Sequence, residues 1–194
     1  AAAHAAIRSR LARATDGYAI AAGPEHGQYL RFVQALAGGR DARIVPLVTR
    51  GGEENLKLLR SGKVALALAQ GDAALDAYEG RGSFAADGPY ATLRAVGSLY
   101  PEPVHVLVRA DSAFSSLADL KERRVAVGVQ GSASRITALR VMQAHGLGVK
   151  DFTPVELALG EALAGLQSKD VDAVIQVIGM PADSIRDALD EVPL

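Results

Sequence analysis

Short apolar runs alternate with stretches of helical periodicity along nearly the whole of this 194-residue chain. This alternation is typical of βα units, whose strands pair mostly in parallel. We therefore expect an α/β protein in which helices flank mostly parallel sheets. The expected strands cover residues 18–22, 43–48, 64–70, 93–100, 104–109, 124–129, 152–157 and 171–178.

The expected helices fill the gaps between these strands, and glycines mark several of their ends. Gly38, Gly62, Gly80 and Gly146 lie just past helical stretches, where glycines commonly end helices. The expected helices cover residues 27–37, 52–61, 72–79, 116–121, 133–145, 160–168 and 182–190.

Two segments in the two halves of the chain resemble each other. LRSGKVALAL (59–68) and LQSKDVDAVI (166–175) align without a gap at an offset of 107 residues. Each predicts a helix end, a polar turn and a buried strand. The repeat indicates two similar lobes, over residues 17–101 and 102–190, that the chain connects through SLYPEPVHVLV (98–108). The alternative is a single doubly wound domain with one long sheet.

The two ends of the chain are interpreted separately. Residues 1–16 lack an apolar signal core and are expected to form a tail or stalk. Residues 191–194 are expected to start the return of the chain to lobe 1. The strands that would complete lobe 1 are then absent, and the open sheet edge would promote self-association.

Composition narrows the choice of partner. The formal net charge is −1 at pH 7, so no broad basic surface favours nucleic acid. Cysteine is absent, which excludes disulfides, thiolate catalysis and Cys-ligated zinc. No apolar run approaches the roughly 20 residues that a membrane span needs. A small ligand is the expected partner.

A glycine- and serine-rich loop follows the apolar run at the start of VAVGVQGSASRITALRV (125–141). Gly131, Ser132 and Ser134 precede or open a helical pattern. A helix start presents unpaired N–H groups and partial positive charge, so this loop is a candidate anion site. The alternative is that the serines only cap the helix.

A similar loop, GPEHGQY (23–29), follows the first expected strand. Its glycines free the backbone, and its glutamine and tyrosine offer side-chain donors. Its histidine is either a cation near an acidic ligand or a solvated loop residue. The candidate ligand residues here are Gly23, His26, Gly27, Gln28 and Tyr29.

A third loop, VTRGGEENL (48–56), places Thr49 and Gly51 ahead of a helix. Arg50 is either a carboxylate clamp or an exposed charge. Three loops of this kind are more than helix capping alone requires.

Catalytic motifs were sought without result. The chain has no G-x-S-x-G, H-E-x-x-H, G-x-x-x-x-G-K-[ST] or G-x-G-x-x-G sequence. We therefore expect a binding protein that needs no metal or cofactor, rather than an enzyme.

Several segments together resemble the TAXI family, the extracytoplasmic solute receptors of TRAP transporters. They are GPEHGQY, GGEENLKLLRSGKVALALAQGD, LRAVGSLYPEPVHVLVRADS, SLADLKERRVAVGVQGSASR and VDAVIQVIGMP. The resemblance runs from about residue 18 to the end of the chain. It implies a two-lobed, type II periplasmic-binding-protein fold in a periplasmic or extracytoplasmic location, with tethering through a segment before residue 1 as one option.

The same resemblance implies a ligand cleft between the lobes and delivery of the ligand to a TRAP membrane permease. Family ligands are small carboxylates and amino acids, including glutamate and 2-oxoglutarate. The chain departs from the family pattern at His26, Gln28, Arg50 and Gly52, which leaves the solute open. The implied ligand contacts are Gly23, Gly27, Tyr29, Thr49, Gly51, Gln70, Asp72, Ser132, Ser134 and Gly179.

These observations predict a solute receptor that closes about a hinge near residues 100–104. Two alternatives stay open. One is the ligand-sensing domain of a signalling protein with the same fold, and the other is a two-lobed transferase acting on anionic substrates.

Overall fold

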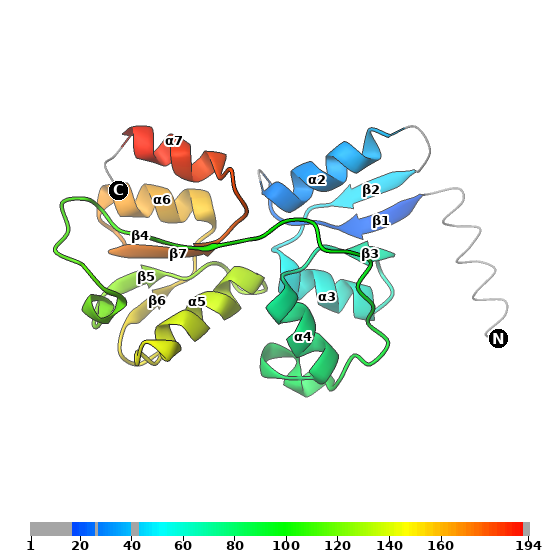
Figure 1. Cartoon of the computed structure of the whole chain (residues 1–194), viewed down its shortest axis with the longest axis horizontal. Coiled ribbons are helices and arrows are strands. Elements are labelled where there is room, and N and C mark those ends of the chain that lie inside the picture. The colour runs from blue at the N-terminus through cyan, green and yellow to red at the C-terminus, as the bar shows by residue number, and fades with distance from the viewer. Residues whose placement is uncertain (1–16, 26, 40–42, 192–194) are drawn as a thin grey trace. The chain divides into compact units, whose positions relative to one another are not determined.

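The structure is a computed structural model that describes residues 17–25, 27–39 and 43–191. The chain divides into two compact units between Leu93 and Arg94. We call the part before this division unit 1 and the part after it unit 2, and Figure 1 shows helices flanking a sheet in each. The tail expected at residues 1–16 lies outside the described residues, and the lobe boundary at residue 101 stays a prediction.

Unit 1 repeats a strand followed by a helix three times. Its elements are β1 (Tyr18–Ala21), α2 (Gln28–Ala37), β2 (Ile44–Leu47), α3 (Gly52–Arg60), β3 (Leu66–Ala67), α4 (Gly71–Glu79) and a 3-10 helix, η1 (Gly82–Asp87). The strand order is β2-β1-β3, and both neighbouring pairs are parallel. The register places Tyr18 opposite Ile44 and Ile20 opposite Leu66.

The core of unit 1 forms between β1 and α2. Ile20 and Ala22, two residues apart, lie on one face of the sheet. Leu30 and Val33, one helical turn apart, pack against them. The local periods of strand and helix therefore meet in this core.

Unit 2 has a mixed sheet in which one strand runs against the others. Its elements are β4 (Val104–Leu107), a 3-10 helix, η2 (Leu117–Leu120), β5 (Arg124–Ala126), α5 (Ala133–Ala144), β6 (Thr153–Val155), α6 (Leu159–Ser168), β7 (Ala173–Val177) and α7 (Asp183–Glu191). The strand order is β4-β7-β5-β6. β5 is parallel to β6 and β7, whereas the edge strand β4 is antiparallel to β7.

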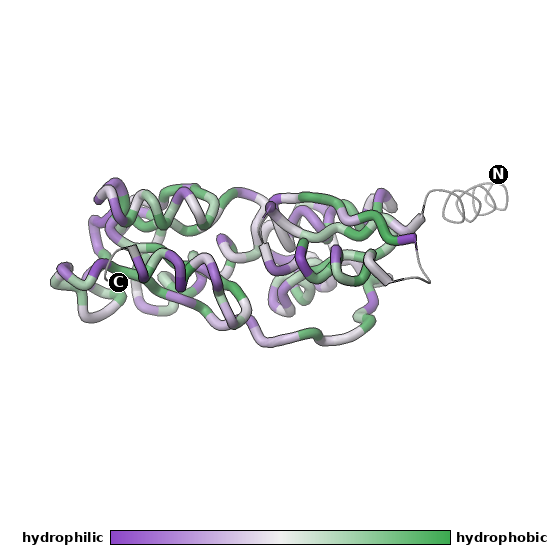
Figure 2. Tube along the Cα trace, turned by 90° about the horizontal axis from the view of Figure 1, so that it is seen from above, coloured by the Kyte–Doolittle hydropathy of each residue, from purple (hydrophilic) through white to green (hydrophobic). Residues whose placement is uncertain are grey.

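Both faces of the central strands of unit 2 are buried. Val125 and Ile175 pack with Met142 of α5 in one cluster. Val174, which points to the opposite face, packs with Leu166 of α6 in another. Parallel strands covered on both faces read as continuous apolar runs, as these do. Figure 2 shows green and purple residues on the same helices, as expected for helices that cover a sheet on one side.

The two units share a topology. The order β6-β5-β7 in unit 2 matches β2-β1-β3 in unit 1, with each strand followed by a helix. β3 begins at residue 66 and β7 at residue 173, which is the 107-residue offset of the sequence repeat.

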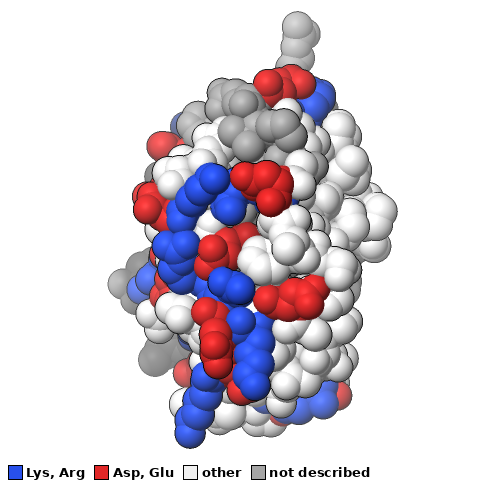
Figure 3. All heavy atoms as spheres, turned by 90° about the vertical axis from the view of Figure 1, so that its left-hand side faces the viewer, with Lys and Arg blue, Asp and Glu red and all other residues white. Residues whose placement is uncertain are grey.

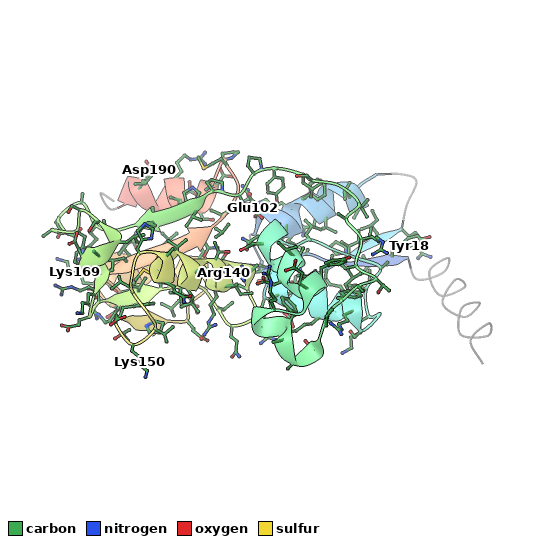
Figure 4. The ribbon with its side chains drawn as sticks, turned by 60° about the horizontal axis from the view of Figure 1, so that its bottom comes forward. Tyr18, Glu102, Arg140, Lys150, Lys169 and Asp190 are labelled. Carbon is green, nitrogen blue, oxygen red and sulfur yellow. The ribbon has the colours of Figure 1, made fainter. Side chains whose placement is uncertain are left out.

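The backbone also repeats at the helix ends that precede β3 and β7. The N–H of Lys63 donates to the carbonyl of Leu58 over 3.0 Å, and the N–H of Asp170 donates to that of Gly165 over 2.8 Å. The left-handed position that closes each helix is Gly62 (φ 71°) in unit 1 and Lys169 (φ 68°), labelled in Figure 4, in unit 2.

Most of the predicted elements are confirmed, and one is wrong. Residues 93–100 form no strand, although their apolar pattern predicts one. Among the described residues no strand pairs with them, and Val96 is 86% exposed. The helix expected at 116–121 is the short 3-10 helix η2, and η1 was not predicted because it is too short to show a helical period.

Candidate functional site

Three loops start from one edge of the sheet in unit 1. β1, β2 and β3 are parallel, so their carboxyl ends lie at the same edge, and each is followed by the loop that leads to the next helix. The N–H of Thr49 donates to the carbonyl of Gly23 over 3.0 Å and joins the first two loops. Ligands of open α/β sheets bind at such edges, where helix N-termini collect.

The charged groups near the start of α3 pair with one another. The guanidinium of Arg50 lies 3.3 Å from Glu54, whose carboxylate also accepts from the N–H of Arg50 over 2.7 Å. Although partial burial raises it, these hydrogen bonds bring the net pKa of Glu54 below its usual value. Glu53 is paired with Lys57 over 2.7 Å. Arg50 is therefore an exposed, internally paired charge in this structure.

Gln70 precedes α4 and is the N-cap of that helix. Its side chain is largely buried, with 8% of the residue exposed, and its Oε1 atom has no hydrogen-bond partner among the described residues. A buried side-chain oxygen without a hydrogen-bond partner is unusual in a folded protein. Asp72, another ligand residue predicted from the sequence, accepts a hydrogen bond from the N–H of Ala73 over 2.8 Å.

The glycine-serine loop of unit 2 connects β5 to α5 as expected. Gly128 and Gly131 have φ values of 89° and 91°. A Cβ at Gly128 would lie 3.1 Å from the Oγ atom of Ser132, so this turn favours glycine twice, by conformation and by space. The turn brings the backbone directly to the N-terminus of α5.

The hydroxyl groups of the two serines of this loop form hydrogen bonds with backbone groups of this chain. Ser132 caps α5: its hydroxyl accepts from the N–H of Arg135 over 3.2 Å and donates to the carbonyl of Val129 over 2.8 Å. Ser134 donates to the carbonyl of Val177 over 3.1 Å. Both hydroxyl protons are thus engaged, and a ligand role for these serines stays a prediction.

The remaining donors at this helix start belong to the backbone. The N–H groups of Ala133 and Ser134 occupy the first turn of α5, where an α-helix offers no internal acceptor. Arg135 follows them, and its guanidinium contacts Glu156 over 2.9 Å. An anion at this position would meet two N–H groups and the positive end of the helix dipole.

The predicted ligand residues fall into two groups, one at the carboxyl edge of each sheet. Gly179 lies two residues past β7. His26 lies outside the described residues. The residues placed in unit 1 are Gly23, Gly27, Gln28, Tyr29, Thr49, Arg50, Gly51, Gln70 and Asp72. Those placed in unit 2 are Gly131, Ser132, Ser134 and Gly179.

Asn55, which the sequence analysis did not select, is fully buried at this edge of unit 1. Its side chain donates to the carbonyls of Ala22 and Leu68 and accepts from the hydroxyl of Thr49. The available signal was composition, because Asn55 is the only asparagine in the sequence.

Two other kinds of site were sought in the described part of the chain. None of its helices is long and apolar enough to cross a bilayer. No group of three His, Cys, Asp or Glu side chains there is placed to hold a metal ion. Figure 3 shows Lys and Arg side chains interleaved with Asp and Glu on one face, so that face has no uniform charge.

A family profile matches this chain from residue 20 to residue 194, and its family is the NMT1-like family. This chain belongs to the NMT1-like family. The finer resemblance to the TAXI receptors stays a prediction.

Solved structures similar to this NMT1-like chain are solute-binding proteins. One is the alkanesulfonate-binding protein SsuA from Xanthomonas axonopodis pv. citri bound to MOPS, with 26% identity over 90% of this chain and 57% of that chain, and a TM-score of 0.56. Another is the periplasmic aliphatic sulphonate binding protein SsuA from Escherichia coli, with 24% identity, 90% and 54% coverage, and a TM-score of 0.54. A third is holo ArgBP from T. maritima, with 13% identity, 92% and 75% coverage, and a TM-score of 0.57.

These similarities confirm the predicted fold class. The NMT1-like chain has an α/β fold with helix-flanked sheets, like that of periplasmic binding proteins. It spans little more than half of the length of the two SsuA proteins.

Proposed function

We propose that this protein is a solute-binding receptor that holds a small organic anion and releases it unchanged. The observation that carries the proposal is the collection of helix N-termini at the carboxyl edge of each sheet, because every parallel strand is followed by a helix. Helix N-termini favour anions through their free N–H groups and their dipoles. The similarity to solute-binding proteins supports this function.

The proposed contacts are mainly backbone groups and neutral side chains. In unit 2 the N–H groups of Ala133 and Ser134 would bind an acidic group. In unit 1 the Oε1 atom of Gln70, which has no partner among the described residues, would accept a hydrogen bond from a donor group of the ligand. We retain the fourteen residues selected from the sequence as the proposed set, with backbone donation expected to exceed hydroxyl donation at Ser132 and Ser134.

At the finer level we propose a carboxylate or amino acid as the ligand and a TRAP-type permease as the partner. The support is the TAXI-like series of segments, above all GGEENL with SGKVALALAQGD. Such a receptor works outside the cytoplasm. We propose that both units take part in capturing the ligand and that they move about the predicted hinge near residues 100–104.

A sulfonate is the second candidate ligand. The similarity to the SsuA protein bound to MOPS favours it. A sulfonate has the same charge as a carboxylate, but it has three oxygens in a pyramidal arrangement, whereas a carboxylate has two in a plane. Backbone N–H groups at a helix start can donate hydrogen bonds to either group, so a direct competition between a sulfonate and a carboxylate is needed to distinguish the two ligands.

The test is thermal stability of the protein with a panel of solutes, followed by calorimetric titration. The panel contains L-glutamate, 2-oxoglutarate, MOPS, arginine and glucose. A ligand present at 100 times its Kd should raise the free energy of unfolding by about 2.7 kcal/mol. Saturable stabilisation only by glucose would overturn the proposal. Stabilisation only by arginine would replace the anion by a cationic amino acid, and chemical conversion of a bound solute would overturn release unchanged. Stabilisation by MOPS but by neither carboxylate would replace the carboxylate by the sulfonate.

A further inference from the structure

One buried side chain links the three strand ends from which the loops of unit 1 start. Asn55 is 0% exposed and lies in α3. Its Nδ2 atom donates to the carbonyl of Leu68 over 2.8 Å and to that of Ala22. Its Oδ1 atom accepts from the hydroxyl of Thr49 over 2.6 Å. The three partners follow β1, β2 and β3 by one or two residues.

These side-chain hydrogen bonds replace the backbone hydrogen-bond ladder between the strands at the point where the strands separate. The ladder still holds at Ala22, whose N–H donates to the carbonyl of Leu47 over 3.1 Å, and at Leu68, whose N–H donates to that of Ala21 over 3.0 Å. Beyond these residues each chain turns towards its own helix. The carbonyl of Ala22, which is buried, and that of Leu68, which is partly buried, would then lack partners, and buried carbonyls without partners are rare. The Asn55 amide supplies one donor to each.

The linkage reaches the proposed ligand groups within two residues. Gly23 follows Ala22 directly, and its carbonyl accepts from the N–H of Thr49 over 3.0 Å. Gln70, whose buried Oε1 atom has no partner among the described residues, is two residues beyond Leu68. A shift of either strand end would therefore move the starts of α2 and α4 and the Gln70 side chain.

We propose that Asn55 is a positioning residue, which holds the three loops of unit 1 in the arrangement that binds the ligand. Its part in ligand binding rests on the proposed function, but its part in ordering the loops does not. Asn55 is not proposed to touch the ligand, because its amide protons and one side of its carbonyl are already engaged within the chain.

The first test is hydrogen–deuterium exchange of the chain, which needs no ligand. Asn55→Asp keeps the side-chain shape but removes both donated protons. It should raise the exchange of the hydrogen-bonded amides at residues 31–34 and 74–77, which begin with the N–H groups that donate to Gly27 and Gln70, at least tenfold, with little change in β5 and β7. Thr49→Val should raise the exchange at the same segments, and Thr49→Ser, which keeps the hydroxyl, should restore their protection.

The control is Val33→Ala, which removes buried packing from the same unit without touching the linkage. It should raise exchange along α2 but not at residues 74–77. Unchanged exchange at residues 74–77 in both Asn55→Asp and Thr49→Val, or a rise there no larger than in Val33→Ala, would overturn the proposal. If Asn55→Asp does not fold, the comparison of the two Thr49 variants decides.

The second test is calorimetric titration with MOPS and with L-glutamate. If the unmodified protein binds either probe, Asn55→Asp should weaken that binding at least tenfold, or about 1.4 kcal/mol, and Val33→Ala should leave the affinity of the folded protein unchanged. Equal affinity in Asn55→Asp and the unmodified protein would overturn positioning. If neither probe binds, the proposed function fails for these ligands, and the exchange experiment still decides the role of Asn55.

Discussion

Replacing Lys169 by glycine should stabilise the protein, because Lys169 ends α6 in a conformation that strains most side chains. Its backbone has φ 68° and ψ 21°, in the left-handed region. The next N–H, of Asp170, closes the helix end by donating to Gly165, so this conformation is part of the helix stop. The equivalent position in unit 1 is Gly62, which has φ 71°.

The expected size of the effect follows from two opposing contributions. The left-handed conformation costs a residue other than glycine roughly 1–2 kcal/mol. Glycine has more freedom in the unfolded chain, which offsets roughly 0.5–1 kcal/mol of this gain. Together these two contributions favour glycine by about 0–1.5 kcal/mol, before the contacts of the lysine side chain are counted.

Lys169→Ala is the matched control for this change. Both variants remove the contact between Lys169 Nζ and Asp111 Oδ2, at 3.4 Å, whose side chains are 63% and 61% exposed. An ion pair this exposed contributes roughly 0–1 kcal/mol. Alanine retains the backbone strain, so the comparison of the glycine and alanine variants cancels the lost ion pair and leaves the strain less the extra freedom of glycine in the unfolded chain.

Gly62→Ala is the reverse experiment in unit 1. A Cβ added at Gly62 would have no heavy atom within 4 Å, so no clash contributes. The substitution should lower the free energy of unfolding by about 0.5–1 kcal/mol through conformation alone.

Urea unfolding of the four proteins, followed by circular dichroism, would measure these differences, and thermal midpoints should move by about 2–4 °C per kcal/mol. The reasoning is refuted if Lys169→Gly is no more stable than Lys169→Ala while Gly62→Ala unfolds at the same urea concentration as the unmodified protein. The two left-handed positions would then carry no strain.

Three further predictions concern unit 2. A side-chain hydrogen bond from Arg124 holds the pKa of Asp172 below its ordinary value. The resulting stabilisation is complete above the unfolded pKa of about 3.9 and is lost as the pH falls through the folded pKa. When the urea midpoint is measured at decreasing pH, Asp172→Asn should therefore lose less stability than the unmodified protein, and equal losses would contradict this prediction. Ser132→Ala should lower the free energy of unfolding by ~0.5–2 kcal/mol through loss of the α5 cap, and an unchanged urea midpoint would show that the helix starts without it. Met142 is fully buried, so Met142→Ala should lower the free energy of unfolding by ~2–5 kcal/mol. Val149 is 59% exposed, so Val149→Ala should change that free energy by less than ~0.5 kcal/mol. Equal effects of the two substitutions would place Met142 outside the core.

The candidate site was predictable as far as its position in the fold. Parallel strands followed by helices place their loops at one edge, so the loops after β1, β2 and β5 could be selected before the structure was known. The direction of each polar group was not predictable. Ser134 donates to Val177, which is 43 residues away in the sequence, and Asn55 donates to Ala22, which is 33 residues away.

The sequence by itself determined the order of helices and strands, the glycine turns and the repeat of the βα pattern. These depend on periods of two to four residues and on backbone preferences, which each segment carries within itself. Only the tertiary structure decided that no strand among the described residues pairs with residues 93–100, that Ser134 of the unit 2 loop donates to Val177, and that Asn55 links three strand ends. The reason is physical: a hydrogen bond needs a partner at the right distance, and for these groups the partner comes from a distant part of the chain that only folding brings close.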